Sequence, residues 1–121
     1  MTYVDGFVLV VPKRKVAAYK KMATWGKNSW LKAGALSYYE CIADDMKPKF
    51  VTFTFPKMAK AKSSETVFFS FITYKNKAHR NAVNKKVMAG MDNDKAPKDM
   101  PFDMKRMAFG GFKALVEGKR R

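Results

Sequence analysis

The sequence predicts a single α+β domain over residues 1–121, in which two helices cover one face of an antiparallel sheet. Three observations lead to this prediction. The chain has the length of one ordinary domain and is too short for two independent cores. Its hydrophobic content of 47% can offset the entropy that is lost on folding. Its strand and helix patterns follow the order β-α-β, a short extra strand, and then β-α-β again.

The first three elements form a β-α-β unit. Residues 2–11 (TYVDGFVLVV) are rich in β-branched and aromatic side chains and predict a strand that Pro12 closes. Residues 13–33 predict a helix that ends near Gly34. Apolar or small residues recur in this helix at steps of three and four and form one stripe, which should face the sheet: Val16, Tyr19, Ala23, Gly26 and Trp30. Residues 35–43 (ALSYYECIA) predict the second strand.

The middle of the chain is the least regular part. Residues 44–49 (DDMKPK) are turn-like by composition. Residues 50–56 (FVTFTFP) alternate apolar side chains with threonines, which predicts a short half-buried strand or an extended arm. Residues 57–65 predict a polar connector with one helical turn.

The second β-α-β unit closes the fold. Residues 66–74 (TVFFSFITY) carry the strongest strand signal in the chain. A helix is expected over residues 77–89, and its inner side should carry Ala82, Val83 and Val87. A loop over residues 91–101 then leads to a last strand over residues 105–116 (KRMAFGGFKALV).

This order is the split β-α-β pattern of ferredoxin-like folds. It leaves one sheet face exposed, because the central strand carries Phe69 and Phe71 on one side and Phe68 and Ile72 on the other, while both helices lie on a single face. A second copy of the chain would cover the open face, so we expect a homodimer that can hold a small-molecule ligand in its interior. The alternative cover is the 50–60 segment folding back.

The charge balance is strongly basic. The chain has 25 Lys and Arg residues against 10 Asp and Glu residues, which gives a net charge of +15. Such a charge attracts nucleic acid or anionic surfaces whatever the fold. The lysines are spread along the chain without a long block, which favours a generally basic surface over a specific nucleic-acid site. Nucleic-acid binding, to RNA for example, is therefore an alternative prediction.

The sequence also indicates the compartment. Cys41 is the single cysteine, so no internal disulfide can form, which fits a reducing environment. The apolar run at residues 7–11 is too short for an export signal, and no stretch approaches the length of about 20 apolar residues that a membrane span needs. We expect a cytoplasmic protein without a membrane partner.

Two acidic residues are candidates for a ligand site. Tyr3 and Asp5 lie on the same face of the first strand as two apolar residues, and a carboxylate there is costly to bury unless it is paired. Arg106 is one candidate partner. The alternative is that Asp5 lies at the solvent-exposed end of the strand and caps a turn. Glu40 raises the same question in the second strand. If buried, it would have a raised pKa and could act as a general acid or base, although structural ion pairs are commoner.

Residues 100–112 (MPFDMKRMAFGGF) are the densest local signal. Pro101 and Asp103 predict a turn in which the Asp103 side chain accepts backbone hydrogen bonds. The glycine pair inside the following strand predicts a bulge or a close backbone contact. Arg106 is expected to pair with Asp5 or Asp103, and Asp103 and Arg106 complete the set of ligand-binding candidates with Tyr3, Asp5 and Glu40.

Several kinds of site are not indicated. His79 is the only histidine, so a site of several histidines cannot form within one chain, and its place at a helix start suggests a solvated face. Neither a phosphate-binding loop nor a dinucleotide motif occurs, and we expect no metal and no cofactor. Trp25 falls nearly opposite the apolar stripe; packing on the 50–60 segment or on a partner subunit is favoured over stacking on a nucleobase.

The motifs YVDGFV, EC followed by DD, ETVFFSFI and MPFDMKRMAFGGF resemble, in order and spacing, the bacterial family known as domain of unknown function 1428 (DUF1428, YbaA-like). The resemblance covers nearly the whole chain and implies a dimeric α+β barrel. It assigns no activity, so whether the protein is an enzyme stays open; a monooxygenase-like activity rests on fold analogy alone. The chain departs from the family pattern at Lys47, Pro48 and Lys49, at Phe71 and at His79.

Overall fold

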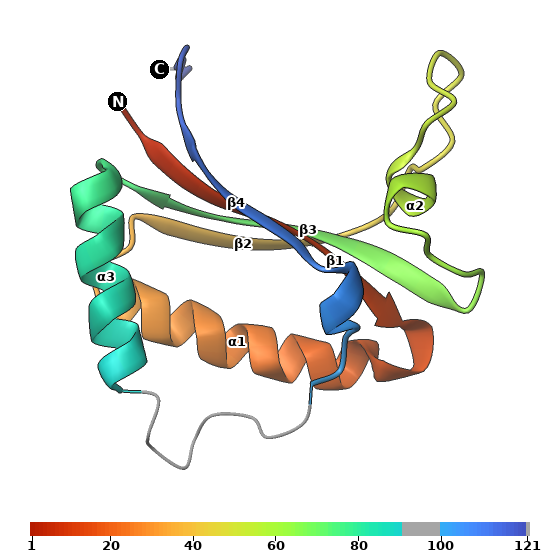
Figure 1. The fold of residues 1–121 in the computed structure, drawn as a ribbon, viewed down its shortest axis with the longest axis horizontal. Helices are drawn as coiled ribbons and strands as arrows, with labels where there is room; N and C mark the ends of the chain where they lie inside the picture. Colours follow the sequence, from red (N-terminus) through yellow and green to blue (C-terminus); the bar gives the residue numbers. More distant parts are fainter. Residues whose placement is uncertain (91–99, 121) are drawn as a thin grey trace.

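The computed structural model describes residues 1–90 and 100–120, and these residues form a four-stranded antiparallel sheet with two long helices on one of its faces (Figure 1). The strands are β1 (Tyr3–Pro12), β2 (Ser37–Ile42), β3 (Glu65–Tyr74) and β4 (Ala108–Lys113), in the spatial order β2-β3-β1-β4. The helices are α1 (Val16–Lys32), α2 (Phe55–Met58) and α3 (Lys77–Ala89), with short 3₁₀ turns at Lys13–Lys15 and Met104–Arg106. The predicted ferredoxin-like α+β fold is confirmed.

Helix α1 uses the predicted stripe. Tyr19, Ala23 and Gly26 are buried against the sheet because they share one face of the helix. The helix ends at Lys32, and Gly34 follows with a φ of 116°, in the left-handed region that a residue with a Cβ avoids. The backbone N–H of Ala35 then donates to the carbonyl oxygen of Trp30, which closes the last turn.

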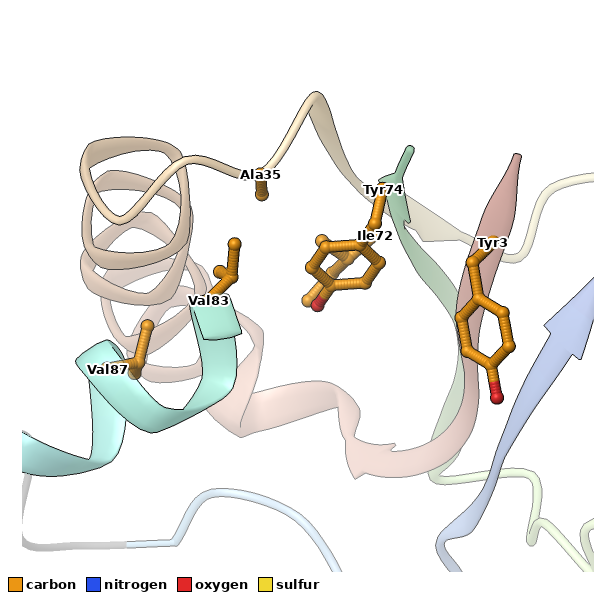
Figure 2. Close-up of a cluster of buried hydrophobic side chains, with 6 residues drawn as sticks. All are labelled: Tyr3, Ala35, Ile72, Tyr74, Val83 and Val87. Carbon is orange, nitrogen blue, oxygen red and sulfur yellow. The ribbon is translucent and has the colours of Figure 1, made fainter. Parts of the chain in front are cut away.

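The register of β1 and β3 sets the two faces of the sheet. Asp5 lies opposite Ile72 and Leu9 lies opposite Phe68, so these side chains share the face that the helices cover. Helix α3 brings Val83 and Val87 to this face, and Figure 2 shows them with the rest of one core cluster: Tyr3, Ala35, Ile72 and Tyr74. Ala82, in contrast to the prediction, is exposed, because it lies on the outer side of α3.

The opposite face carries the aromatic residues that the sequence placed there. Phe69 is 46% exposed, and Phe71 stacks on Tyr39 with 4.9 Å between the ring centroids. Phe112 of β4 lies against Gly6 on the same face. Both sheet faces are apolar, as predicted, and the two long helices cover only one of them. We call this second surface the open face.

The prediction of a strand at residues 50–56 is wrong. Thr54 and Pro56 act as a helix start: the Thr54 hydroxyl accepts from the backbone N–H of Lys57, and the proline occupies the first turn of α2. The segment before α2 stands out on the side of the open face (Figure 1), and its Phe50 is 90% exposed. Just after α2, Ala59 is buried in a cluster with Val10 and Val67, so the segment covers one end of the open face.

The glycine pair in β4 allows close approach. A Cβ on Gly111 would collide with the phenol of Tyr3, and a Cβ on Gly110 would lie 3.4 Å from the ring of Phe112. The pairing of β4 with β1 runs without an extra residue, so the close-contact alternative holds and the bulge does not. Strand β4 begins only at Ala108, because the preceding residues form the 3₁₀ turn. The predicted loop at residues 91–99 lies outside the described part of the chain. Among the helices of the described residues, none has the length and apolar character of a membrane span.

Candidate functional site

The candidate site is a cavity of about 510 Å³ between the helix-covered face of the sheet, α1, α3 and the segment before β4. This volume falls within the range of small-molecule sites in proteins. Most of its lining is aromatic or methionine: Phe7, Tyr19, Met22, Trp25, Trp30, Tyr38, Met88, Met100, Phe102, Met104, Met107 and Phe109. Among the residues that the structure describes, the polar groups of the lining, besides the tyrosine hydroxyls and tryptophan N–H groups, are Asp5, Glu40, Ser70 and Asn84.

Glu40 is the first polar centre of the cavity. It comes from β2, and its carboxylate accepts hydrogen bonds from the hydroxyls of Tyr19 (2.8 Å) and Tyr38 (2.8 Å) and from the hydroxyl of Ser70. Burial, together with the negative charge of Glu40, raises the pKa of both tyrosines well above the usual range. Both phenols therefore stay protonated and act as hydrogen-bond donors to the carboxylate.

A second hollow lies on the other side of this cluster. It is a groove of about 310 Å³ between α1 and the edge of the sheet, and Tyr19, Tyr38 and Glu40 line both it and the larger cavity. Lys20 and Lys27 line the groove but not the cavity. Glu40 thus stands at the boundary between two spaces that solvent or a ligand can enter.

Asp5 is the second polar centre. Its side chain is only 2% exposed, and it forms an ion pair with Arg80 at 3.2 Å between Oδ1 and Nη1. The same guanidinium donates to the Tyr3 hydroxyl at 3.3 Å and lies 5.0 Å from the centre of the Tyr3 ring. Burial raises the pKa of Asp5, while the charge of Arg80 and hydrogen bonds from Tyr74 and Asn84 oppose this rise. Asp5 is therefore a paired interior carboxylate.

The prediction that Asp5 pairs with Arg106 is wrong, as is the alternative that Asp5 lies at a wet strand end. Arg106 instead makes a two-pronged contact with Glu65, at 2.8 Å and 2.7 Å, and its Nε donates to Asp103 at 2.7 Å. The Asp103 pairing and its acceptance of a backbone N–H, from Lys105 at 2.9 Å, are as predicted. These contacts join the start of β3 to the turn before β4.

The five candidate residues are thus divided by the fold. Asp5 and Glu40 line the cavity, whereas Tyr3, Asp103 and Arg106 do not belong to its described lining. The two carboxylates lie on strands separated by β3 and opposite different residues of it, Ile72 and Ser70, so their Cα atoms are roughly 12 Å apart. They cannot share a proton, and each has a role of its own.

Several site residues were missed from the sequence. Ser70 faces Glu40 directly in the pairing of β2 with β3, and Arg80 reaches Asp5 from the first turn of α3. Asn84, one turn further on, accepts from the Trp30 ring N–H at 3.0 Å. The available signal was the high methionine content of nine residues, since five of the methionines that the structure describes line the cavity.

The structure also places Trp25 and His79 differently from the predictions. Trp25 lines the cavity, to which the 50–60 segment contributes no described residue, so the predicted packing on that segment is wrong, and packing on a partner subunit stays a prediction. His79 is half-buried, and its Nδ1 accepts from the backbone N–H of Lys75 at 3.0 Å, which gives it a role in the turn before α3. Within residues 1–90 and 100–120, no group of three or more His, Cys, Asp or Glu side chains is placed to hold a metal ion.

Comparison with known proteins gives a family and no activity. The family described as "Protein of unknown function (DUF1428)" matches residues 2–104. The "Uncharacterized protein YbaA" of Escherichia coli strain K12 is 41% identical over 117 residues, covering 97% of this chain and 99% of that protein, and its counterpart in Shigella flexneri gives the same figures. Among solved structures, a chain described as "De novo designed protein Foldit4" is 10% identical with a TM-score of 0.48, covering 94% of this chain and 99% of that chain.

Proposed function

The chain belongs to the DUF1428 family of proteins of unknown function, as its motifs predicted, and from this premise we propose that it binds a small, largely apolar molecule in the cavity between sheet and helices. The observation that carries this proposal is the cavity of about 510 Å³, lined mainly by aromatic and methionine side chains with a few polar groups. A mostly apolar hollow with few polar groups is the usual form of a small-molecule site. The methionines add adaptability, because their unbranched side chains repack around different shapes.

Ligand binding in the cavity can be followed by tryptophan fluorescence. Trp25 and Trp30 are its two tryptophans, and both line the cavity. A ligand that enters should change tryptophan fluorescence and should raise the melting temperature, because binding to the folded state stabilises it by mass action. A panel of small apolar molecules, measured by both methods, tests the proposal.

A matched pair of variants shows where a ligand binds. Met104 and Met58 are both partly exposed, but only Met104 lines the cavity, whereas Met58 lies in α2 beside the open face. Met104→Trp should reduce the ligand-induced rise in melting temperature because the larger side chain takes up cavity volume, and Met58→Trp should leave it unchanged. No thermal shift and no fluorescence change across the panel would reject the proposal.

We also propose that the protein is a cytoplasmic homodimer that pairs through the open face. The rings of Tyr39, Phe71 and Phe69 lie in contact on the face that the two long helices do not cover, and Phe112 lies on the same face against Gly6. Exposed surfaces of this kind in soluble proteins usually mark contacts with a partner. The segment before α2 stands on the same side (Figure 1), where it would lie beside a second copy. The exposed thiol of Cys41 supports a reducing compartment.

Nucleic-acid binding is a second candidate that one observation favours. Both long helices lie on the same side of the sheet, and their outer surfaces carry exposed lysines: Lys20, Lys21, Lys27, Lys32, Lys77, Lys85 and Lys86. Affinity for RNA or duplex DNA that falls steeply with salt would support this candidate, because binding would release counterions. No binding to either at low salt would reject it.

A further inference from the structure

We infer that Glu40 is the recognition group of the cavity and that it selects apolar molecules carrying an N–H or O–H donor. This inference rests on the proposed ligand-binding function and names the chemical class of the ligand. It begins from the difference between the two carboxylates of the cavity. Asp5 has a cation in contact, because Arg80 lies 3.2 Å away. Among the described residues Glu40 forms no ion pair, and its three partners are neutral hydroxyls.

The lysines of the neighbouring groove do not remove this difference. Lys20 and Lys27 line the groove outside the cluster, and neither forms an ion pair with Glu40 in the structure. A half-buried carboxylate without a cation gains from every further hydrogen bond that it accepts, because hydrogen bonds to charged groups are stronger than those between neutral groups. A ligand donor is the group that the cavity lacks at this point.

The carboxylate also has a free accepting position. An ionised carboxylate offers about four acceptor sites, two on each oxygen. Within the described part of the chain, Tyr19 and Ser70 both donate to Oε1, whereas Oε2 accepts from Tyr38 alone. The unfilled position is therefore on Oε2. A ligand that presented only acceptors, such as an ether or a carboxylate, would meet repulsion there, since the hydroxyls around Glu40 already point at it.

The other lining residues offer fewer hydrogen-bond acceptors to an N–H or O–H group of a ligand. The carboxyl group of Asp5 is paired with Arg80, and the side-chain oxygen of Asn84 accepts from the Trp30 ring N–H and the Tyr74 hydroxyl. Most other lining residues are apolar. A bound molecule would therefore be oriented by a single strong contact, with its donor on Glu40 and its apolar body among the aromatic and methionine side chains.

Two molecules of nearly equal shape test this inference. 4-tert-Butylphenol and 4-tert-butyltoluene differ by a hydroxyl in place of a methyl group, so the toluene is the more hydrophobic of the two. Without a hydrogen bond in the cavity it should bind at least as tightly as the phenol. With the hydrogen bond to Glu40, we expect the phenol to bind about 10-fold tighter in a tryptophan fluorescence titration.

The variant Glu40→Gln removes the charge with little change of shape. Its carbonyl oxygen can still accept from Tyr19 and Ser70, and its amide can donate to the Tyr38 oxygen, so the cluster keeps its hydrogen bonds. We expect the preference for the phenol to fall below about 3-fold in this variant. Asp45→Asn, the same chemical change at an exposed residue outside the cavity, should retain the full preference.

The outcomes separate this inference from the proposed function. Equal binding of phenol and toluene to the wild-type protein, a measurement that needs no variant, would overturn the role of Glu40 while leaving the cavity as a binding site. A preference that Glu40→Gln retains would do the same. Failure of both molecules, and of the wider apolar panel, to bind the wild-type protein would reject the proposed function as well.

Discussion

At the scale of single residues, Arg106 holds together two parts of the chain that are far apart in sequence. It binds Glu65 through two hydrogen bonds and Asp103 through a third, and its Nη1 also donates to the carbonyl oxygen of Lys60 at 2.9 Å. The hydrogen bonds from Arg106 lower the pKa of Glu65 to about 2 and also lower the pKa of Asp103. The motif around Arg106 is therefore explained by folding, without a part in the cavity.

The contacts of Arg106 with Glu65 and Asp103 predict that the stability of the protein depends on pH. Because the pKa of Glu65 in the folded state, about 2, is below its ordinary value of 4.5, the folded state holds fewer protons in that interval. The stability that Glu65 contributes is fully present above the unfolded pKa and is lost as the pH falls toward the folded pKa. We expect Glu65→Gln to flatten the decline of the urea midpoint between about pH 5 and pH 2. If the urea midpoint falls with pH at the same rate in wild type and variant, the Arg106–Glu65 contact does not stabilise the fold.

The Asp5–Arg80 pair predicts a pH dependence of stability in the opposite direction. Arg80→Met would leave a buried carboxylate without its cation, and we expect a loss of about 3 kcal/mol of unfolding free energy near neutral pH. The pKa of Asp5 is already raised by burial, so the folded state takes up a proton more readily than the unfolded chain. The loss should shrink as the pH falls and Asp5 becomes protonated. Urea unfolding at several pH values measures it.

The double variant Asp5→Asn, Arg80→Met is the control for this pair. It removes the unpaired charge, so it should be more stable than Arg80→Met alone near neutral pH and should not share its pH dependence. If Arg80→Met is as stable as wild type, or if its destabilisation does not vary with pH, Arg80 is not the group that compensates Asp5.

At the scale of elements, the contact of α1 with β2 depends on a glycine. A Cβ on Gly26 would lie 2.7 Å from the hydroxyl oxygen of Tyr38. In an exposed helix Gly→Ala stabilises by about 1 kcal/mol, but overpacking of an interior costs about 1–3 kcal/mol. We expect Gly26→Ala to lower the unfolding free energy by about 1 kcal/mol, because the Tyr38 hydroxyl must leave Glu40.

The background variant Tyr38→Phe reverses this prediction. Without the hydroxyl, a Cβ on Gly26 would meet the ring carbon of residue 38 at 3.5 Å, an ordinary contact. In that background Gly26→Ala should become stabilising, by up to about 1 kcal/mol, as its helix propensity indicates. A destabilisation of equal size in both backgrounds would place the clash elsewhere. Chemical denaturation of the four proteins gives the answer.

The sequence was informative where the chain follows a simple period. The stripe of α1 and the alternation of β1 and β3 placed Tyr19, Asp5 and Phe69 on their correct faces, because each face follows from spacing alone. The helical turn expected within residues 57–65 begins earlier, at Phe55, because the alternation at residues 50–56 looks like a strand although Thr54 and Pro56 form a helix start.

The composition of the site was less predictable. Glu40 could be identified as an acidic residue on an inward strand face, but its partner Ser70 is 30 residues away, and Arg80 is 75 residues from Asp5. Such pairings depend on which strand lies beside which and on the rotation of α3 about its axis. Local spacing carries no information on either, so the charge of Arg106 seemed as suitable a partner for Asp5 as that of Arg80.

At the scale of the whole molecule, the two faces of the sheet have separate proposed roles. The helix-covered face holds the cavity, and the open face is the proposed contact with a second copy (Figure 1). Phe69 lies on the open face, 46% exposed, and contacts Phe71 and Phe55. Phe69→Lys would place a charge in the proposed interface without touching the cavity.

We expect wild-type protein to sediment as a dimer at micromolar concentration and Phe69→Lys to sediment as a monomer, because an unpaired charge in an apolar interface is costly. Leu36→Lys is the matched control: Leu36 is 52% exposed but lies in the turn between α1 and β2, so this variant should remain dimeric. A wild-type monomer would contradict the argument that a second copy covers the open face.

The central claim is that the cavity between sheet and helices is a ligand site. A crystal structure of the protein with saturating 4-tert-butylphenol tests it most directly. The account predicts the ring among the aromatic and methionine side chains, with its hydroxyl oxygen about 3 Å from Oε2 of Glu40. A cavity that is empty, or filled by the protein's own side chains at saturating phenol, would contradict it.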